Sequence, residues 1–198
     1  MKNALLLSAL LLLSTYGFAQ NLVPNPQFEA PRPSSESYNP SMQCYNGSCK
    51  ELTNLFRYSP AQNWTVWLGT YQNYACVMTE LVKAGSNCVL PWPNYVMGNM
   101  MHVKTTVGGS GIVNSDIHAG ANKVKISCWV YVIKGRVYMG YGSTGNPIIS
   151  TTSKTTCRWE RLELIKSGAE TCNQIVLYSD NNLDSEFYVD AVFVEAFK

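Results

Sequence analysis

A stretch near the end of the chain, residues 157–197, constrains the fold more than any other part of the sequence. Apolar and polar residues alternate with a period of two over residues 159–165, 174–178 and 186–195, which is typical of β-strands. The two short segments that separate these runs are rich in Gly, Ser, Asn and Asp, residues that favour turns. The pattern therefore predicts three strands in a row.

The last of these strands has apolar residues at consecutive positions. Phe187 and Val189 fall on one face, and Tyr188 and Val192 fall on the other, so we expect layers of the protein to cover both faces. Asp190 is the exception within this strand. An unpaired buried charge is costly, so this carboxylate needs a partner.

The rest of the chain continues the β pattern and shows no long helical period. An edge strand over residues 20–30 is followed by a long polar loop over 31–58, and further strands and loops follow up to residue 142. The predicted strands after the loop cover residues 71–82, 100–106, 112–117, 123–133 and 136–142. We predict an all-β fold, a two-sheet antiparallel β-sandwich of the jelly-roll type.

The first nineteen residues have the pattern of a secretory signal peptide, with Lys2 before a leucine-rich run and Ala19 at the expected cleavage point. We therefore expect residues 1–19 to be removed and 20–198 to form a single domain. The product is expected to be secreted, with the periplasm or the cell surface as other destinations. A formal net charge of +2 and dispersed lysines argue against nucleic acid as a partner, and no later apolar stretch is long enough to span a membrane.

Seven cysteines favour disulfides after export. Cys44 with Cys49 and Cys76 with Cys88 are plausible local pairs, although the sequence does not fix the connectivity. One cysteine is left over, so it stays reduced or links the protein to an extracellular partner. Zinc is disfavoured because the chain has no CxxC pair and only two histidines. The cysteines are Cys44, Cys49, Cys76, Cys88, Cys128, Cys157 and Cys172.

Three segments together resemble a known group of proteins. They are the opening NLVPNPQFE from Asn21 to Glu29, the central KISCWVYVIKG from Lys125 to Gly135, and WERL from Trp159 followed by FYVDAVFV from Phe187. They resemble jelly-roll carbohydrate-binding modules with the galactose-binding-domain-like fold, with families four, nine and twenty-two as the nearest. The resemblance implies a β-sandwich fold and a polysaccharide or glycan as the partner, but fold alone does not fix function.

The same resemblance implies a structural calcium ion held by an early Glu and a late Asp, which map to Glu29 and Asp190. Carboxylate oxygens suit calcium. The alternative interpretation is that Asp190 accepts backbone hydrogen bonds in a turn or bulge.

Sugar recognition uses aromatic rings, because the apolar C–H faces of a pyranose stack on them. Within residues 123–133, Trp129 and Tyr131 lie on the face opposite Cys128, so they point outward if Cys128 points into the core. Other aromatic residues lie on an adjoining strand or near loops, and packing in the core is the competing explanation for each ring. The candidate ligand-binding residues are Trp67, Trp92, Tyr95, Trp129, Tyr131 and Tyr138.

The sequence favours a secreted, non-catalytic carbohydrate-binding module. Glycoside hydrolysis needs two facing carboxylates, and the spacing of the acidic residues selects no such pair, so we do not expect an enzyme. The alternative function is an extracellular structural or adhesive protein that uses the same sandwich for protein contacts.

Overall fold

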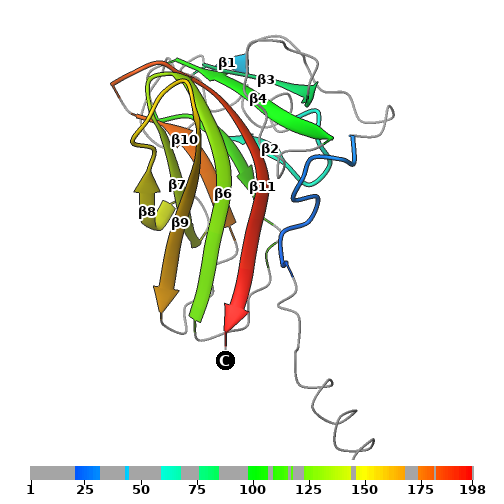
Figure 1. The fold of residues 1–198 in the computed structure, drawn as a ribbon, viewed down its shortest axis with the longest axis vertical. Helices are drawn as coiled ribbons and strands as arrows, with labels where there is room; N and C mark the ends of the chain where they lie inside the picture. The colour runs from blue at the N-terminus through cyan, green and yellow to red at the C-terminus, as the bar shows by residue number, and fades with distance from the viewer. Residues whose placement is uncertain are drawn as a thin grey trace, which may run out of the picture.

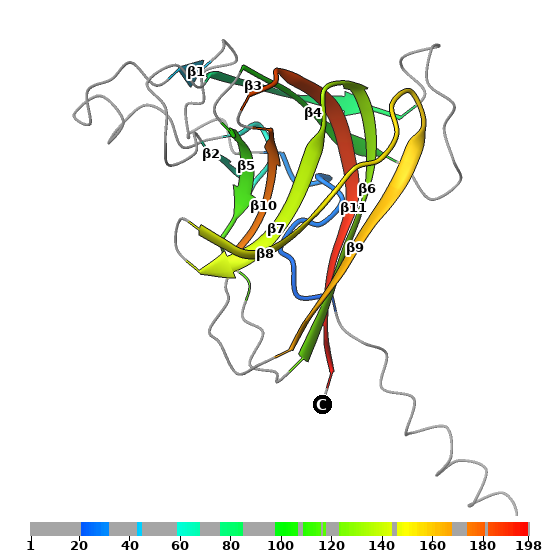
Figure 2. The ribbon, with the colours of Figure 1, turned by 90° about the vertical axis from the view of Figure 1, so that its left-hand side faces the viewer.

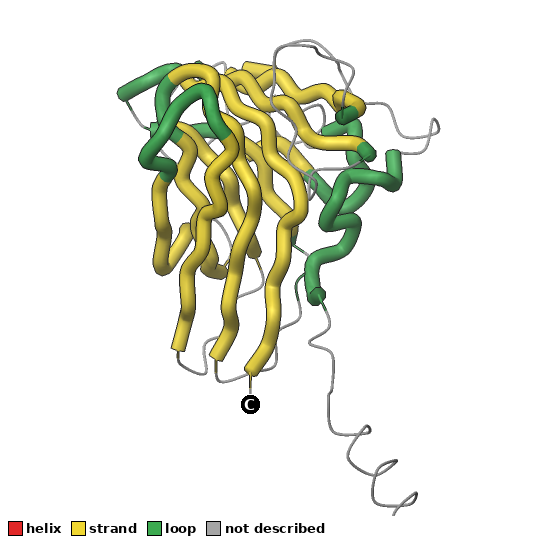
Figure 3. The backbone as a smooth tube through the Cα atoms, in the orientation of Figure 1, coloured by secondary structure: helices red, strands yellow, loops and turns green. Residues whose placement is uncertain are grey.

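The computed structural model of the protein contains two antiparallel β-sheets that pack face to face (Figures 1 and 2). All regular elements among the described residues are strands (Figure 3). This architecture confirms the predicted all-β antiparallel sandwich. The structure describes residues 21–31, 43–44, 59–67, 76–84, 98–106, 109–115, 117, 123–143, 146–167, 174–180 and 182–197.

The larger sheet has six strands in the order β1-β3-β4-β11-β6-β9, and the smaller has five in the order β2-β5-β10-β7-β8. The strands of the larger sheet are β1 (Gln43–Cys44), β3 (Cys76–Lys83), β4 (Asn99–Thr105), β11 (Ser185–Phe197), β6 (Lys123–Lys134) and β9 (Trp159–Ser167). Those of the smaller sheet are β2 (Thr65–Trp67), β5 (Gly111–Asn114), β10 (Gln174–Ser179), β7 (Val137–Ser143) and β8 (Asn146–Thr152). Among these residues, no helix is long and apolar enough to cross a membrane.

The core lies between the two sheets and is built largely from alternate residues of β2–β7 and β9–β11. The side chain of Cys128 on β6 is fully buried there and its Sγ lies 3.5 Å from the Sδ of Met139 on β7. The face of β6 that carries Cys128 therefore points inward, as the sequence pattern required for Trp129 and Tyr131 to point outward. Other core residues include Ile126, Val130, Val132, Phe187, Val189, Ile175 and Leu177.

β11 differs from its predicted pattern because a β-bulge interrupts it. The register with β6 shifts between Asp190 and Phe193, and Ala191 has a φ of 48°. A bulge inserts an extra residue, so the inward and outward faces exchange beyond it. Val192 joins Phe187 in the core, although strict alternation placed it on the opposite face. The bulge thus turns Phe187, Val189, Val192 and Val194 toward the core. Tyr188 and Asp190, on the other face of the strand, are also buried.

The opening segment is not a strand, contrary to the prediction for residues 20–30. Residues 21–31 form turns, with an isolated bridge between Pro31 and Ala61. The segment is attached to β11 by two backbone hydrogen bonds, from the Leu22 amide to the Val194 carbonyl (3.0 Å) and from the Val192 amide to the Pro26 carbonyl (2.9 Å). The prolines in this segment lack the amide that a continuous ladder needs, so only scattered pairing forms.

Candidate ligand-binding face

Three aromatic side chains form a row on the outer face of the five-stranded sheet. The row consists of Trp67 on β2, Tyr178 on β10 and Tyr138 on β7. Gly111 on β5 pairs with both Trp67 and Tyr178, and Tyr178 pairs with Tyr138. The chain neighbours of these rings, such as Val66, Leu177 and Val137, point into the core. Because side chains alternate along a strand, the three rings point outward. We call Trp67, Tyr178 and Tyr138 the aromatic strip.

The rings of the strip contact one another in sequence. Tyr138 and Tyr178 stack with centroids 5.3 Å apart and an interplanar angle of 21°. Trp67 meets Tyr178 edge to face, at 5.3 Å and 75°. All three side chains are half-buried. The rings thus support one another and keep part of their surface exposed to solvent.

Gly111 allows this arrangement because the strands approach closely at its position. A Cβ atom built on Gly111 would lie 1.9 Å from the carbonyl oxygen of Leu177, a distance that a side chain cannot tolerate. With no side chain at Gly111, the ring of Trp67 reaches Tyr178 across β5. Glycine in a strand is known to mark such close approaches.

Polar groups lie along the strip. The Tyr138 hydroxyl donates to Oδ2 of Asp180 (3.1 Å), and Oδ1 of Asp180 accepts from the Asn182 amide (2.9 Å). Burial raises the pKa of the Tyr178 phenol, a hydrogen bond with Ser150 opposes this shift, and the neighbouring Tyr138 phenol adds to it. The strip therefore combines apolar ring faces with hydroxyl and carboxylate oxygens that can bind hydroxyl groups of a ligand.

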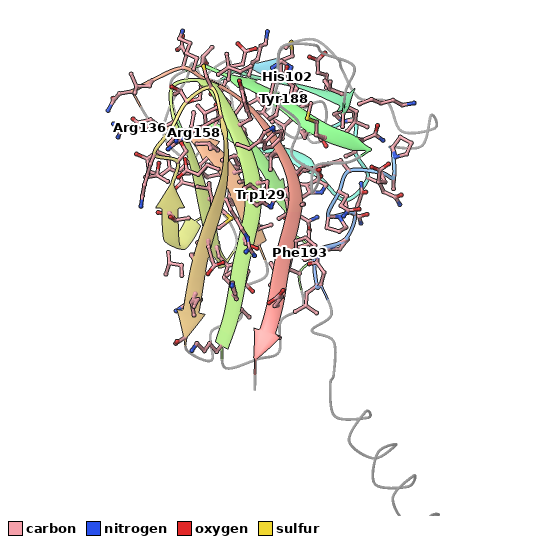
Figure 4. The ribbon with its side chains drawn as sticks, in the orientation of Figure 1. His102, Trp129, Arg136, Arg158, Tyr188 and Phe193 are labelled. Carbon is pink, nitrogen blue, oxygen red and sulfur yellow. The ribbon has the colours of Figure 1, made fainter. Side chains whose placement is uncertain are left out.

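The outer face of the six-stranded sheet carries a second aromatic row, but its central rings are buried. Trp159 contacts Tyr131 at 5.7 Å, Tyr131 contacts Tyr188 at 6.5 Å, and His102 stacks on Tyr188 at 4.4 Å and 15°. Tyr131 is 6% exposed and Tyr188 is 5% exposed. Figure 4 shows His102 beside Tyr188, with Trp129 further along the sheet. The packing of these rings leaves the middle of the row little surface for a ligand.

His102 ends this second row within a cluster of charged groups. Its Nδ1 is bonded to Oε1 of Glu80, and its Nε2 lies 3.0 Å from Oε1 of Glu186. Lys104 also contacts Glu186, with its Nζ 3.2 Å from Oε1. The His102 side chain is 5% exposed. This cluster is not evident from the sequence, because its members come together only when β3, β4 and β11 pair.

The structure separates the six predicted ligand residues. Trp67 and Tyr138 come together in the aromatic strip, whereas Trp129 and Tyr131 lie on the other sheet. The sequence predicts Tyr138 on a strand adjoining that of Trp129, but β6 and β7 belong to different sheets. The chain crosses from one sheet to the other at residues 135–136. Alternation of apolar and polar residues predicts a strand but not the sheet to which it belongs. Trp92 and Tyr95 lie outside the described residues.

Tyr178, which lies at the centre of the strip, is not among the ligand-binding residues predicted from the sequence. Its signal was present, because the alternation over residues 174–178 sets Tyr178 on the face opposite Ile175 and Leu177, both fully buried. The pairing of β10 with β5 and β7, which puts Tyr178 between the other two rings, is visible only in the folded structure.

Glu29 and Asp190 each have protein partners in the structure. Oε1 of Glu29 accepts from the Asn99 amide (2.7 Å), and Oδ1 of the buried Asp190 accepts from the Ala191 amide (2.7 Å). Among the described residues, no group of three or more His, Cys, Asp or Glu could hold a metal ion. These contacts agree with the alternative interpretation of Asp190 as a bulge residue, and a calcium ion at Glu29 and Asp190 stays a prediction.

Solved structures of several carbohydrate-binding modules have a similar fold. The family 11 module from Clostridium thermocellum in complex with a β-1,3-1,4-mixed-linked tetrasaccharide is 17% identical, with 72% of this chain and 94% of that chain covered and a TM-score of 0.48. The xylan-binding family 22 module CBM22-1 of Paenibacillus barcinonensis is 12% identical, with 81% and 97% covered and a TM-score of 0.47. Some other matched structures are parts of enzymes.

Family 22 modules, which the sequence motifs also resemble, are among the matched structures. A family 61 module in complex with β-1,4-galactotriose is 14% identical, with 90% of this chain and 100% of that chain covered and a TM-score of 0.39. No protein-family model matches the chain, and no curated protein matches its sequence.

Proposed function

We propose that the protein is an exported, non-catalytic carbohydrate-binding module that holds a polysaccharide or glycan on the aromatic strip. The observation that carries this proposal is the row of three half-buried aromatic side chains across one sheet. Ring faces of this kind stack on the apolar C–H faces of sugars. Because the rings contact one another, little side-chain freedom is lost when a ligand binds, which favours affinity.

The length of the strip suits an oligosaccharide rather than a single sugar. Trp67 on β2 and Tyr138 on β7 end the row. The centroid of each of these rings lies 5.3 Å from that of Tyr178, so the two outer centroids are at most twice that distance apart. It runs across the strands, and a bound chain would lie in the same direction.

The polar groups of the strip favour a neutral glycan. Asp180 contributes a carboxylate beside Tyr138, and a negative charge at this place disfavours uronic acids and sulfated sugars by like-charge repulsion. The carboxylate and the hydroxyl of Ser150, which bonds to Tyr178, can accept hydrogen bonds from sugar hydroxyls.

The contacts of the acidic residues support a non-catalytic function. Glu80 is bonded to His102, Glu163 pairs with Lys125 at 2.9 Å, and Asp184 pairs with Lys134 at 3.1 Å. Glu160 accepts hydrogen bonds from the amides of residues 154 and 155 (2.8 and 3.1 Å). These carboxylates hold local structure, which is a different task from the paired acid and nucleophile of a glycosidase.

Affinity electrophoresis against plant, algal, fungal and bacterial polysaccharides, both neutral and anionic, tests the proposal. We expect retention on at least one neutral glycan, and loss of that retention in Tyr178→Ala. Trp129→Ala, on the opposite sheet, is the matched control and should retain binding. Retention on no polysaccharide would overturn the proposal and favour the adhesive or structural function. Loss in Trp129→Ala alone would move the site to the six-stranded sheet.

A further inference from the structure

The pairing of β1 with β3 brings two cysteines to the same position of the sheet. In this antiparallel pair, Cys44 is the direct partner of Cys76, next to the pair Gln43 and Val77. The Cα atoms of directly opposed residues in antiparallel strands are about 4.5–5.5 Å apart. This range falls within the Cα separations of about 4.4–6.8 Å that disulfides span.

Cys128 is enclosed by the core of the sandwich. Its side chain is fully buried, and Sγ lies against Sδ of Met139. Burial raises the pKa of its thiol far above the ordinary value, and the Arg161 charge only partly opposes this effect. The thiolate is the form that attacks a disulfide, so Cys128 is both inaccessible and unreactive in the folded protein.

Cys128 also cannot pair with Cys157, the other cysteine whose side chain the structure describes. Cys157 is exposed, and its amide donates to the carbonyl of Val132 (2.8 Å). Val132 lies four residues beyond Cys128 on β6, a distance of about 13 Å along a strand. The backbone of Cys157 lies beside Val132, so Cys157 is farther from Cys128 than the roughly 7 Å limit between the Cα atoms of a disulfide.

We propose that Cys44 and Cys76 form a disulfide across β1 and β3, and that Cys128 is the cysteine that stays a thiol. This pairing replaces the two local pairs, Cys44 with Cys49 and Cys76 with Cys88, that we considered from the sequence. Cys157 is likewise unpaired in the structure but exposed, so Cys128 is the one whose thiol the fold encloses.

The bond forms by oxidation of two thiols. With oxidised glutathione as the oxidant, the thiolate of one cysteine attacks the disulfide of glutathione. This step forms a mixed disulfide and releases one molecule of reduced glutathione. The second cysteine then attacks the mixed disulfide and releases another. Two protons and two electrons pass from Cys44 and Cys76 to the oxidant. Formation of this disulfide does not depend on which ligand the protein binds.

Peptide mapping by mass spectrometry tests the disulfide. The reduced protein, residues 20–198, is incubated with oxidised glutathione, blocked with an alkylating agent and digested with trypsin without reduction. Trypsin cuts after Lys50, Arg57 and Lys83, so Cys44 and Cys76 fall in different peptides. We expect the peptide that ends at Lys50 to be joined to the peptide 58–83. A link of Cys76 to the peptide 84–104, or alkylated Cys76, would overturn the proposal.

Cys49 lies in the same peptide as Cys44, so two variants distinguish them. The link should persist in Cys49→Ser and disappear in Cys44→Ser. The opposite result would show that Cys49 is the partner and would overturn the register argument. Correct folding of each variant is checked by its circular dichroism spectrum before the map is read.

Sequential alkylation tests the second part of the proposal. The oxidised protein is treated with one reagent in native buffer and with an isotopically heavier reagent in denaturant, without reductant. Cys128 should carry only the heavier label. A light label on Cys128, or its recovery in a disulfide-linked peptide, would contradict its assignment as the buried thiol.

Discussion

Tyr178 lies between two other rings of the strip, stacked on Tyr138 with centroids 5.3 Å apart and in an edge-to-face contact with Trp67. More than a hundred residues separate Trp67 from Tyr178 in the sequence. The row exists only because the strands pair in the order β2-β5-β10-β7. The central ring supports both neighbours. Substitution of Tyr178 should therefore affect ligand binding more than substitution of either outer ring.

On a glycan that the protein binds, we expect Tyr178→Ala to raise Kd by at least about tenfold, which corresponds to about 1.4 kcal/mol. This is the size expected for the loss of one ring–ligand stacking contact and its burial. Trp67→Ala should weaken binding by a smaller factor, since Trp67 ends the row. Isothermal titration calorimetry with an oligosaccharide gives both values. A Kd that is unchanged in both variants would contradict the assignment of the strip.

The raised pKa of Tyr178 predicts a pH dependence of stability. Burial and the neighbouring Tyr138 phenol hold this pKa above its ordinary value of 10.0, against the effect of the Ser150 hydrogen bond. The folded protein keeps the phenolic proton more tightly than the unfolded chain does. The contribution of this proton to stability is therefore complete below about pH 10 and is lost as the pH rises through the pKa of the folded state.

Urea unfolding at a series of pH values measures this effect. The free energy of unfolding of the wild type should fall more steeply above about pH 10 than that of Tyr178→Phe, which has no phenolic proton to lose. Below that pH the difference between the two proteins should be constant. Parallel curves over the whole alkaline range would show that Tyr178 does not titrate as predicted.

Gly111→Ala should destabilise the protein strongly. The new methyl group would lie 1.9 Å from the Leu177 carbonyl oxygen, so β5 and β10 must separate. We expect a loss of about 3 kcal/mol or more in the free energy of unfolding, at the upper end for overpacking. Lys123→Ala, at an exposed strand position, is the control and should change stability by less than about 0.5 kcal/mol. Urea denaturation followed by tryptophan fluorescence measures both, and equal midpoints would show that the strands tolerate a side chain.

His102→Ala should destabilise the six-stranded sheet. The substitution removes the ring that stacks on Tyr188 and leaves Glu80 and Glu186 without the group that joins them. We expect a loss of about 2 kcal/mol or more, because the histidine side chain is only 5% exposed. Lys104→Ala removes a partly exposed partner of Glu186 and should cost less than about 1 kcal/mol. A similar cost for both substitutions, measured by urea denaturation, would show that the buried ring is not the main contributor.

Asp190→Ala should be destabilising whether or not calcium is present. It removes the acceptor of the Ala191 amide at the bulge of β11, and an unpaired buried amide costs about 1–3 kcal/mol. Asp190→Asn keeps an oxygen acceptor and should retain most of the stability. Melting temperatures with and without a chelator test the calcium prediction separately. A wild-type curve that the chelator leaves unchanged would exclude a structural calcium ion at Glu29 and Asp190.

The sequence by itself determined the strands other than β1, β2 and β8, and the inward face of most of them. The alternation around Cys128 correctly set Trp129 and Tyr131 on an outer face, and the predicted strand over residues 174–178 corresponds closely to β10. These features follow from a period of two and from side-chain chemistry, both of which are local properties of the chain. The same local pattern failed at Ala191, where one extra residue reverses the alternation.

Only the tertiary structure decided which rings share a face and which cysteines face each other. Trp67 and Tyr178 lie far apart in the sequence, and β6 and β7, which are consecutive, belong to different sheets. Strand order is set by the packing of two sheets around one core. Residues that are distant in the sequence bury their apolar side chains against one another there. No segment of the sequence contains that information alone, so the aromatic strip, the His102 cluster and the alignment of Cys44 with Cys76 could be read only from the folded chain.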